Sequence, residues 1–134
     1  MGRTRDCLAM KTKGEIEAEI TEAIVKFEME YMGRGPKEAR THIIEDMILV
    51  RLQGVLTPAE QQLTKSVDGV ELIKRMRYTL IENARPILFK VIGDITGAKV
   101  IALHTDISTV SGERIIAFTL DRDLESTLPR KKIP

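Results

Sequence analysis

Apolar and polar positions along the first part of the chain follow a helical period and then change to a strand period. The helical part predicts a helix over about 13–31. Its apolar stripe consists of Ile16, Ile20, Ala23, Ile24, Phe27 and Tyr31. Runs of β-branched and apolar residues then predict two strands, 39–44 and 47–53, joined by a tight turn at Glu45 and Asp46.

The next segment carries the strongest local signal in the chain. Thr57 is followed by Pro58 and Glu60, the pattern of a helix N-cap with a proline at the first helical position and a returning carboxylate. This capping box predicts a short helix over 58–66. Apolar residues at helical spacing predict a long helix over 69–92.

The remaining predictions concern Pro86 and the second half of the chain. Pro86 lies inside the long helix and should kink or split it, because proline removes one backbone hydrogen bond. The stretch 93–99 is expected to be a loop. Strands are predicted over 99–105 and 113–120, and both faces of the second strand are fairly apolar, which is typical of a strand in the centre of a sheet or against a partner.

The element order α-β-β-α-α-β-β indicates an α+β fold, with an antiparallel sheet of about four strands and helices packed on one face. A chain of 134 residues fits one domain. We expect this domain to span 13–124, with a flexible N-terminal extension over 1–12 and a flexible basic tail over 125–134.

Composition narrows the range of functions. There are 21 basic and 20 acidic residues, and the net charge of +1 provides no general attraction to nucleic acid. Tryptophan is absent and aromatic residues are 4%, which argues against a base-stacking platform. No apolar run approaches the roughly 18 residues that span a bilayer, so we expect no direct membrane insertion. The single cysteine, Cys7, and the lack of a secretory signal indicate the cytoplasm.

The stretch "LHTDIST" (103–109) ends an apolar run with polar side chains. His104 and Asp106 share one face of the predicted strand, so the aspartate could orient the imidazole for general-base catalysis. The alternative is a turn, because Asp and Ser side chains bond nearby backbone amides. Only two histidines are present, which excludes a three-histidine metal site, although His42 and His104 with carboxylates remain conceivable ligands. We assign no catalytic residue, metal or cofactor.

Two further features could bind an anion. The "GRGP" loop (33–36) offers Arg34 and the backbone of Gly35, although it lacks the spacing of a phosphate-binding loop and also suits a helix-ending turn. Arg77 and Arg85 lie on a basic side of the long helix, which could equally be a solvated face. If the fold brings these residues together with His104 and Asp106, they would form a concave anion site.

The motifs "GRGP", "GVLTPAE", "RMR", "TGAKV", "LHTDIST" and "GERIIAFTL" follow one another in this order. In this respect the chain resembles the MpsC-like domain, a small bacterial domain named after a component of a proposed Na+-translocating, membrane-potential-generating system. The resemblance covers about 12–124. It implies an accessory or regulatory subunit of a larger membrane-associated system and brings no catalytic residue with it.

These observations predict a non-catalytic accessory or regulatory module that works through protein contacts. We expect a homo-oligomer, a dimer, because a small sheet leaves edges and apolar faces that a second copy can cover. A membrane-protein partner would place the cytoplasmic module at the membrane periphery. The alternative is a sensor for a small anion or nucleotide, built from the GRGP loop, His104 and the arginines of the long helix. A hydrolase or transferase using His104 and Asp106 ranks last.

Overall fold

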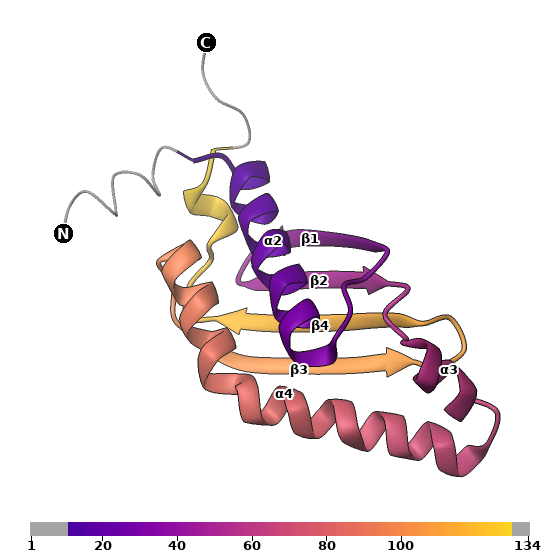
Figure 1. The fold of residues 1–134 in the computed structure, drawn as a ribbon. Helices are drawn as coiled ribbons and strands as arrows, with labels where there is room; N and C mark the ends of the chain where they lie inside the picture. Colours follow the sequence, from indigo (N-terminus) through magenta and orange to yellow (C-terminus); the bar gives the residue numbers. More distant parts are fainter. Residues whose placement is uncertain (1–10, 130–134) are drawn as a thin grey trace.

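A four-stranded antiparallel sheet forms the centre of the fold in the computed structural model, which describes residues 11–129 (Figure 1). The strands are β1 (Glu38–Ile44), β2 (Met47–Gln53), β3 (Val100–Ser108) and β4 (Glu113–Leu120). Their order across the sheet is β1-β2-β4-β3. The two strands of each hairpin, β1 with β2 and β3 with β4, are neighbours, and the pairing of β2 with β4 joins the two hairpins. The predicted α+β class and the antiparallel four-stranded sheet are confirmed.

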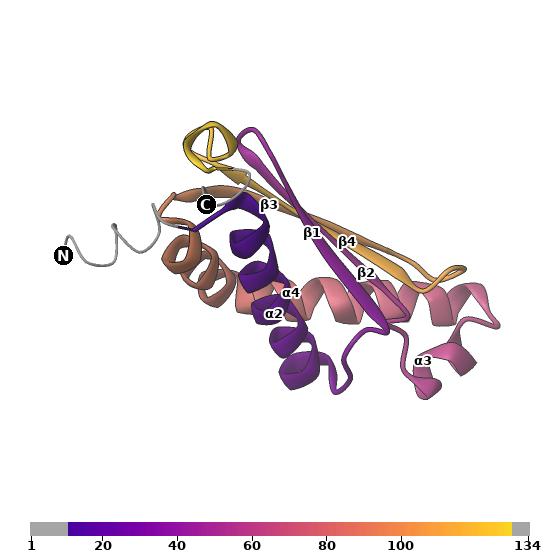
Figure 2. The same cartoon turned by 90° about the horizontal axis from the view of Figure 1, so that it is seen from above.

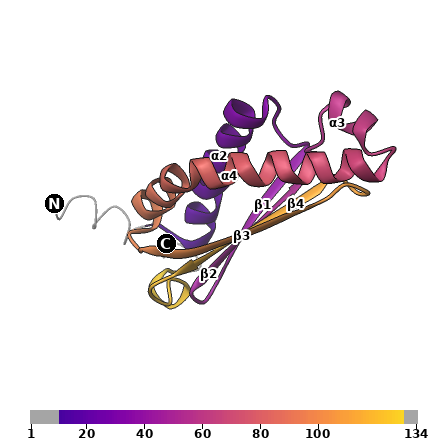
Figure 3. The same ribbon diagram turned by 90° about the horizontal axis from the view of Figure 1, so that it is seen from below.

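The helices lie on one side of this sheet, as Figures 2 and 3 show. They are α2 (Lys13–Met32), α3 (Pro58–Leu63) and α4 (Val67–Thr96), and a 3-10 turn, η1 (Glu125–Thr127), follows β4. None of the helices in residues 11–129 combines the length and the apolar content needed to cross a membrane.

Local sequence signals mark both ends of α2 and the start of α3. Thr12 and Glu15 form a capping box at the start of α2, and Gly33 ends this helix in the left-handed conformation at φ 82°. Thr57 and Glu60 form the predicted capping box of α3. Helix α3 ends at Leu63, three residues before its predicted end, and Ser66 caps the next helix.

Helix α4 is longer than the sequence indicated. It extends to Thr96 with Pro86 inside it, and it changes direction in its second half (Figure 1). The predicted loop over 93–99 is therefore wrong for its first four residues. The reason is that Gly97, and not Gly93, takes the left-handed cap conformation, at φ 74°, while Thr96 continues the buried stripe of the helix.

The core lies between the sheet and the helices. Alternate strand residues point into it, including Ile48, Val50 and Leu52 from β2 and Ile116, Phe118 and Leu120 from β4, and all six are buried. Helix α2 contributes Ile16, Ile20, Ile24 and Phe27, and α4 contributes Ile73, Ile81, Ala84, Leu88 and Ile92. One face of the sheet is thus fully covered by helices.

The ends of the predicted domain need adjustment. Beyond the predicted boundary at 124, Leu128 is buried and the Lys13 N–H donates to the carbonyl of Pro129, so the fold continues into the segment expected to be a tail. At the other end, Thr12 caps α2 and is buried. The rest of the predicted extension and tail, with Cys7, lies outside the described residues.

Candidate functional site

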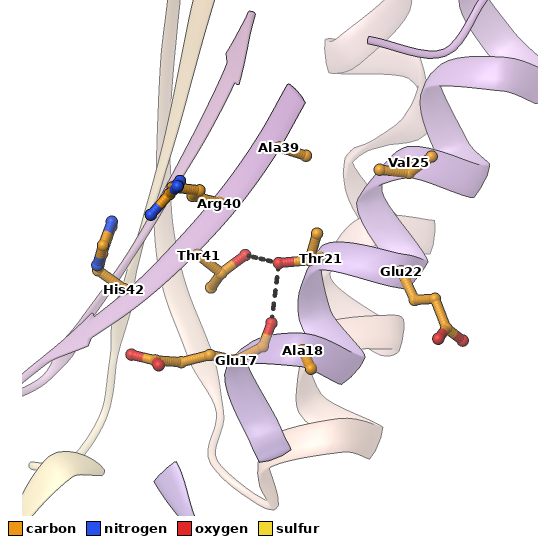
Figure 4. Close-up of a pocket in the computed structure, with 9 residues that line it drawn as sticks. All are labelled: Glu17, Ala18, Thr21, Glu22, Val25, Ala39, Arg40, Thr41 and His42. Carbon is orange, nitrogen blue, oxygen red and sulfur yellow. Dashed lines mark hydrogen bonds between the residues drawn. The ribbon is translucent and has the colours of Figure 1, made fainter. Parts of the chain in front are cut away.

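The face of the sheet that the helices leave uncovered is the first candidate site, and we call it the open face. Figure 4 shows where it begins: on β1, Thr41 points toward α2 and bonds Thr21, whereas Arg40 and His42 point away from the helix. Strand register places the open-face side chains in rows across all four strands. The first row is Ile44, Met47, Thr119 and Ala102; the second is His42, Leu49, Ala117 and His104; the third is Arg40, Arg51, Ile115 and Asp106.

The middle of the open face is apolar. Met47, Leu49, Ile115 and Ala117 are partly exposed there, and Ile44 at the edge is 43% exposed. A solvated face of an antiparallel sheet normally carries polar residues in alternation with the buried ones. A contiguous apolar patch in this position is typical of a surface that contacts another molecule.

Both histidines belong to the second row, at its two ends. Three strand spacings separate His42 from His104, or about 14 Å at roughly 4.8 Å per strand. Ligands of one metal ion must lie within a few ångströms of each other, so the two histidines cannot share an ion within one chain. Among residues 11–129, no group of three or more His, Cys, Asp or Glu side chains is placed to hold a metal ion.

A buried charge cluster is the second candidate site, on the opposite, helix-covered face. It contains Glu28 of α2, Glu60 of α3, Arg77 of α4 and Arg114 of β4, which are 0%, 4%, 2% and 2% exposed. Arg77 donates from Nε to Glu60 Oε2 at 2.8 Å and from Nη2 to Glu60 Oε1 at 2.7 Å. Its Nη2 also donates to the carbonyl of Val55 at 3.0 Å, so this arginine ties α4 to α3 and to the preceding loop.

Glu28 is held less closely. Its carboxylate oxygens lie 3.7 Å from Arg77 Nη1 and 3.7 Å from Arg114 Nη1, and no described residue within hydrogen-bond distance donates to either oxygen. Desolvation raises the pKa of Glu28, against the attraction of Arg114 and Arg77. Desolvation also lowers the pKa of Arg114, although Glu28 opposes the change. Burial of the cluster thus disfavours charge on both Glu28 and Arg114.

The pKa of Glu60 moves in the other direction. Burial alone would raise it, but hydrogen bonds from Arg77 and from the Thr57 backbone outweigh burial and lower the pKa. The capping box therefore does more than begin α3, because it orients the carboxylate that receives Arg77. Two carboxylates and two guanidinium groups give the cluster no net charge, which is the arrangement expected of a structural ion-pair network.

Two hollows adjoin the cluster, and a third lies apart from it. A cavity of about 180 Å³ adjoins the cluster and is lined by Lys74, Arg77, Tyr78, Thr105, Asp106, Ile107 and Arg114. A groove of about 460 Å³ runs between α2, α3 and α4, and is lined mainly by apolar side chains, with Glu60 and Arg77 at its base. A wider trough of about 610 Å³ lies between α2 and β1, as Figure 4 shows.

The structure brings together only two of the predicted anion-site residues. Arg77 and Asp106 both line the small cavity beside the cluster. Arg34 instead donates to the carbonyl of Leu56 at 2.9 Å, so the GRGP loop is a helix-ending turn whose arginine holds the β2–α3 loop. Gly35 lies against Met29, where an added Cβ would approach Met29 Cγ to 3.1 Å.

The other two predicted residues lie elsewhere. Arg85 pairs with Glu82 at 3.1 Å and lies over the ring of Phe89, on the surface of α4. His104 is exposed on the open face, on the other side of the sheet from the cluster. The carboxylate of Asp106 accepts a hydrogen bond from the N–H of Ile107 at 2.8 Å and lies 3.8 Å from Lys74 Nζ. These two contacts turn the carboxylate toward the edge of the sheet.

Sequence reasoning missed Glu28 and Arg114 as members of a cluster. A usable signal exists for both. Arg114 precedes Ile116, Phe118 and Leu120 at strand spacing, and so belongs to their buried face. Glu28 follows Ile24 by one helical turn, which places it on the inward side of α2. A charged residue that continues a buried stripe needs a buried partner, and this rule would have pointed to an ion-pair network.

Comparison with known proteins assigns the chain to a family. The family model described as "Na+-translocating membrane potential-generating system (MpsC)" matches residues 12–122. The protein YbcI of Bacillus subtilis (strain 168) is 44% identical over 120 residues, covering 90% of this chain and 97% of YbcI, and is described as uncharacterised. YrhF of the same strain, also described as uncharacterised, is 27% identical over 112 residues, covering 80% of this chain and 88% of YrhF. No solved structure matches the chain at a significant level. The match over most of the chain shows that this protein belongs to the MpsC family.

Proposed function

We propose that the chain is a non-catalytic module that works through protein contacts, with the open face as its contact surface. One observation carries the proposal: the sheet is covered by helices on one face only, while apolar side chains gather on the other face. Leu49 and Ala117 lie in the middle of that face, in adjacent strands. A partner that covers this patch would remove apolar area from water, which drives most protein association.

The arrangement of His104 and Asp106 supports a role in contact over a role in acid–base chemistry. A general base is normally oriented by the carboxylate beside it. Here the Asp106 carboxylate is engaged by Ile107 N–H and lies near Lys74. His104 is thus left as an exposed side chain at one end of the second row, suited to an interface contact.

The family description supports the wider setting of the module. It names a Na+-translocating system that generates a membrane potential, and we place this chain in such a system as an accessory or regulatory subunit. We place it on the cytoplasmic side, held at the membrane through a membrane-protein partner, because a single cysteine in the sequence is typical of a reducing compartment.

Photo-crosslinking in the native cells tests the contact surface. A benzophenone amino acid is introduced in place of Leu49, and in a control chain in place of Val110, a turn residue that is 98% exposed and lies outside the open face. We expect a defined adduct from position 49, identified by mass spectrometry, that is lost when Ala117→Arg places a charge beside it. Equal adducts from both positions, or none from position 49, would contradict the proposal.

A second candidate function rests on the cavity beside the cluster. The cations Arg77, Arg114 and Lys74 line it and are groups that recognise small anions, and the carboxylate of Asp106 lines it as well. Its volume of about 180 Å³ is below the roughly 300–1,000 Å³ of sites for drug-sized ligands, so it suits a small anion better than a nucleotide. Thermal unfolding in phosphate, sulfate and acetate at constant ionic strength tests this candidate. An increase in Tm for one anion, absent in Lys74→Ala, would support it, and equal Tm values in all three would exclude it.

A further inference from the structure

The two halves of the open face differ in bulk and in charge. The half built by β1 and β2 carries the large side chains Ile44 and Leu49 and the cation Arg40. The half built by β3 and β4 carries, in the same three rows, Ala102, Ala117 and Asp106. In two rows a large apolar residue of one half therefore has an alanine at the mirror position of the other half, and in the third row Arg40 has Asp106 at its mirror position.

This difference makes the open face complementary to itself. A two-fold axis that runs parallel to the strands, between β2 and β4, superposes β1 on the partner's β3 and β2 on the partner's β4. Each row then meets the same row of the second copy in reverse order. Leu49 would face the partner's Ala117, Ile44 would face the partner's Ala102, and Arg40 would face the partner's Asp106.

The other face-to-face arrangement lacks this match. A two-fold axis perpendicular to the strands places β1 over the partner's β1 and β2 over the partner's β2. With the axis at the middle row, the order of the rows is reversed, so Arg40 would lie over the partner's Ile44 and not face Asp106. This arrangement leaves Arg40 without an anion opposite it, whereas complementary charges fix the register of an interface. Charge thus selects the first arrangement.

The area of the open face agrees with a dimer of two such copies. Four strands of 7 to 9 residues span about 19 Å by 25 Å, or roughly 480 Å² per copy, at about 4.8 Å between strands and 3.3 Å per residue. Two copies would cover on the order of 1,000 Å² in projection, and the corrugation of the side chains makes the accessible area larger. This value reaches the threshold of roughly 1,000 Å² for a specific interface.

We propose that a second copy of this chain packs on the open face, as an aligned two-sheet sandwich with its two-fold axis along the strands. Sheets packed in this way lie about 10 Å apart, a distance that an arginine and an aspartate can span together. Arg40 makes no ion pair with any residue in the range 11–129, whereas Asp106 pairs with Lys74 at 3.8 Å through a side chain that is 81% exposed. In the dimer the exposed Asp106 carboxylate would exchange its contact with Lys74 for one with the partner's Arg40. This inference rests on the proposed function, since it assigns the contact surface to a second copy.

Sedimentation equilibrium of the full chain tests the dimer, over about 1–100 µM protein. We expect the wild type to dimerise and Leu49→Lys to raise the dimer Kd at least about tenfold, because it buries an unpaired charge in the interface. Ala117→Arg makes the same test from the other half of the face. Leu72→Lys is the matched control: Leu72 is 55% exposed in the groove between the helices, away from the open face, and its replacement should leave the Kd unchanged.

A charge exchange tests the arrangement within the dimer. Arg40→Glu and Asp106→Arg should each raise the Kd about threefold or more, and the double variant should return it to near the wild-type value. Thermal unfolding of each variant verifies that the chain remains folded. A wild type that stays monomeric at 100 µM would overturn the proposal, as would a Kd that neither open-face variant raises or a double variant without recovery. If position 49 crosslinks in cells to a different protein and the chain is monomeric, the dimer is wrong while the proposed function stands.

Discussion

Replacing Arg77 with methionine should remove a large part of the stability of this fold. The substitution keeps an apolar side chain of comparable length but deletes two hydrogen bonds to Glu60, at 2.8 and 2.7 Å, and one to Val55, at 3.0 Å. It leaves two buried carboxylates, Glu28 and Glu60, with Arg114 as the remaining cation of the cluster. With every group of the cluster ionised, its formal net charge changes from zero to −1.

The size of the effect follows from the cost of a buried charge without its partner. Removing one member of a buried ion pair costs about 3–5 kcal/mol, because the desolvation penalty of the other member is no longer offset. At roughly 0.05–0.15 kcal/mol per residue, a chain of 134 residues has a free energy of unfolding of about 7–20 kcal/mol. Arg77→Met should therefore leave a folded but much less stable protein.

Urea unfolding followed by circular dichroism measures the loss. We expect the midpoint to fall with little change in the m-value, since the surface exposed on unfolding stays nearly the same. Arg75→Met is the matched control, because Arg75 is exposed on the same helix and its replacement should change stability by no more than about 0.5 kcal/mol. A loss below about 1 kcal/mol for Arg77→Met would refute the view that the cluster depends on this arginine.

Three further predictions concern single groups. Because the folded-state pKa of Glu28 is raised, the native state binds a proton there more tightly than the unfolded chain does, so this group adds stability as the pH falls from neutral toward 4.5. Glu28→Gln should remove that contribution, and urea titrations with parallel pH dependence in the two proteins would contradict it. Thr57→Ala should cost about 1 kcal/mol, because the Glu60 N–H loses its acceptor; Thr57→Ser should restore most of it. Gly97→Ala should lower the free energy of unfolding by about 1–2 kcal/mol, because alanine is strained in the left-handed conformation at φ 74°. An unchanged Tm would show that the substitution introduces no such strain.

The parts of the fold that depend on neighbouring residues could be predicted from the sequence. The capping box at Thr57 and Glu60 needs only residues three apart, and it lies where the pattern placed it. The hairpin of β1 and β2 needs only two apolar runs and a turn, which Glu45 forms at φ 55°. The element order and the antiparallel sheet followed from these local signals.

The order of the strands and the candidate site could not be predicted in the same way. Pairing of β2 with β4 joins segments about 70 residues apart, and no local pattern specifies it. The sequence places Arg77 on a basic side of the long helix with Lys74 and Arg85, because their spacing puts the three on one broad side. Arg77 is also one turn from Ile73 and from Ile81, both buried, and its partner Glu60 lies on a different helix. Only the assembled fold decides between these two environments.

The apolar character of the open face requires an explanation that the monomer does not provide. Strand β4 points Ile116 and Phe118 into the core and Ile115 and Ala117 to the opposite side, so it is apolar on both faces, as expected of a strand in the centre of a sandwich. Yet the helices cover only one of its faces. If the other face remained in water, polar residues at 49, 115 and 117 would give the same fold at lower risk of aggregation. The apolar side chains at these positions are accounted for when a second layer covers the sheet. In the dimer that we propose, Arg40 and Asp106 at opposite ends of one row would each face the other residue of the second copy.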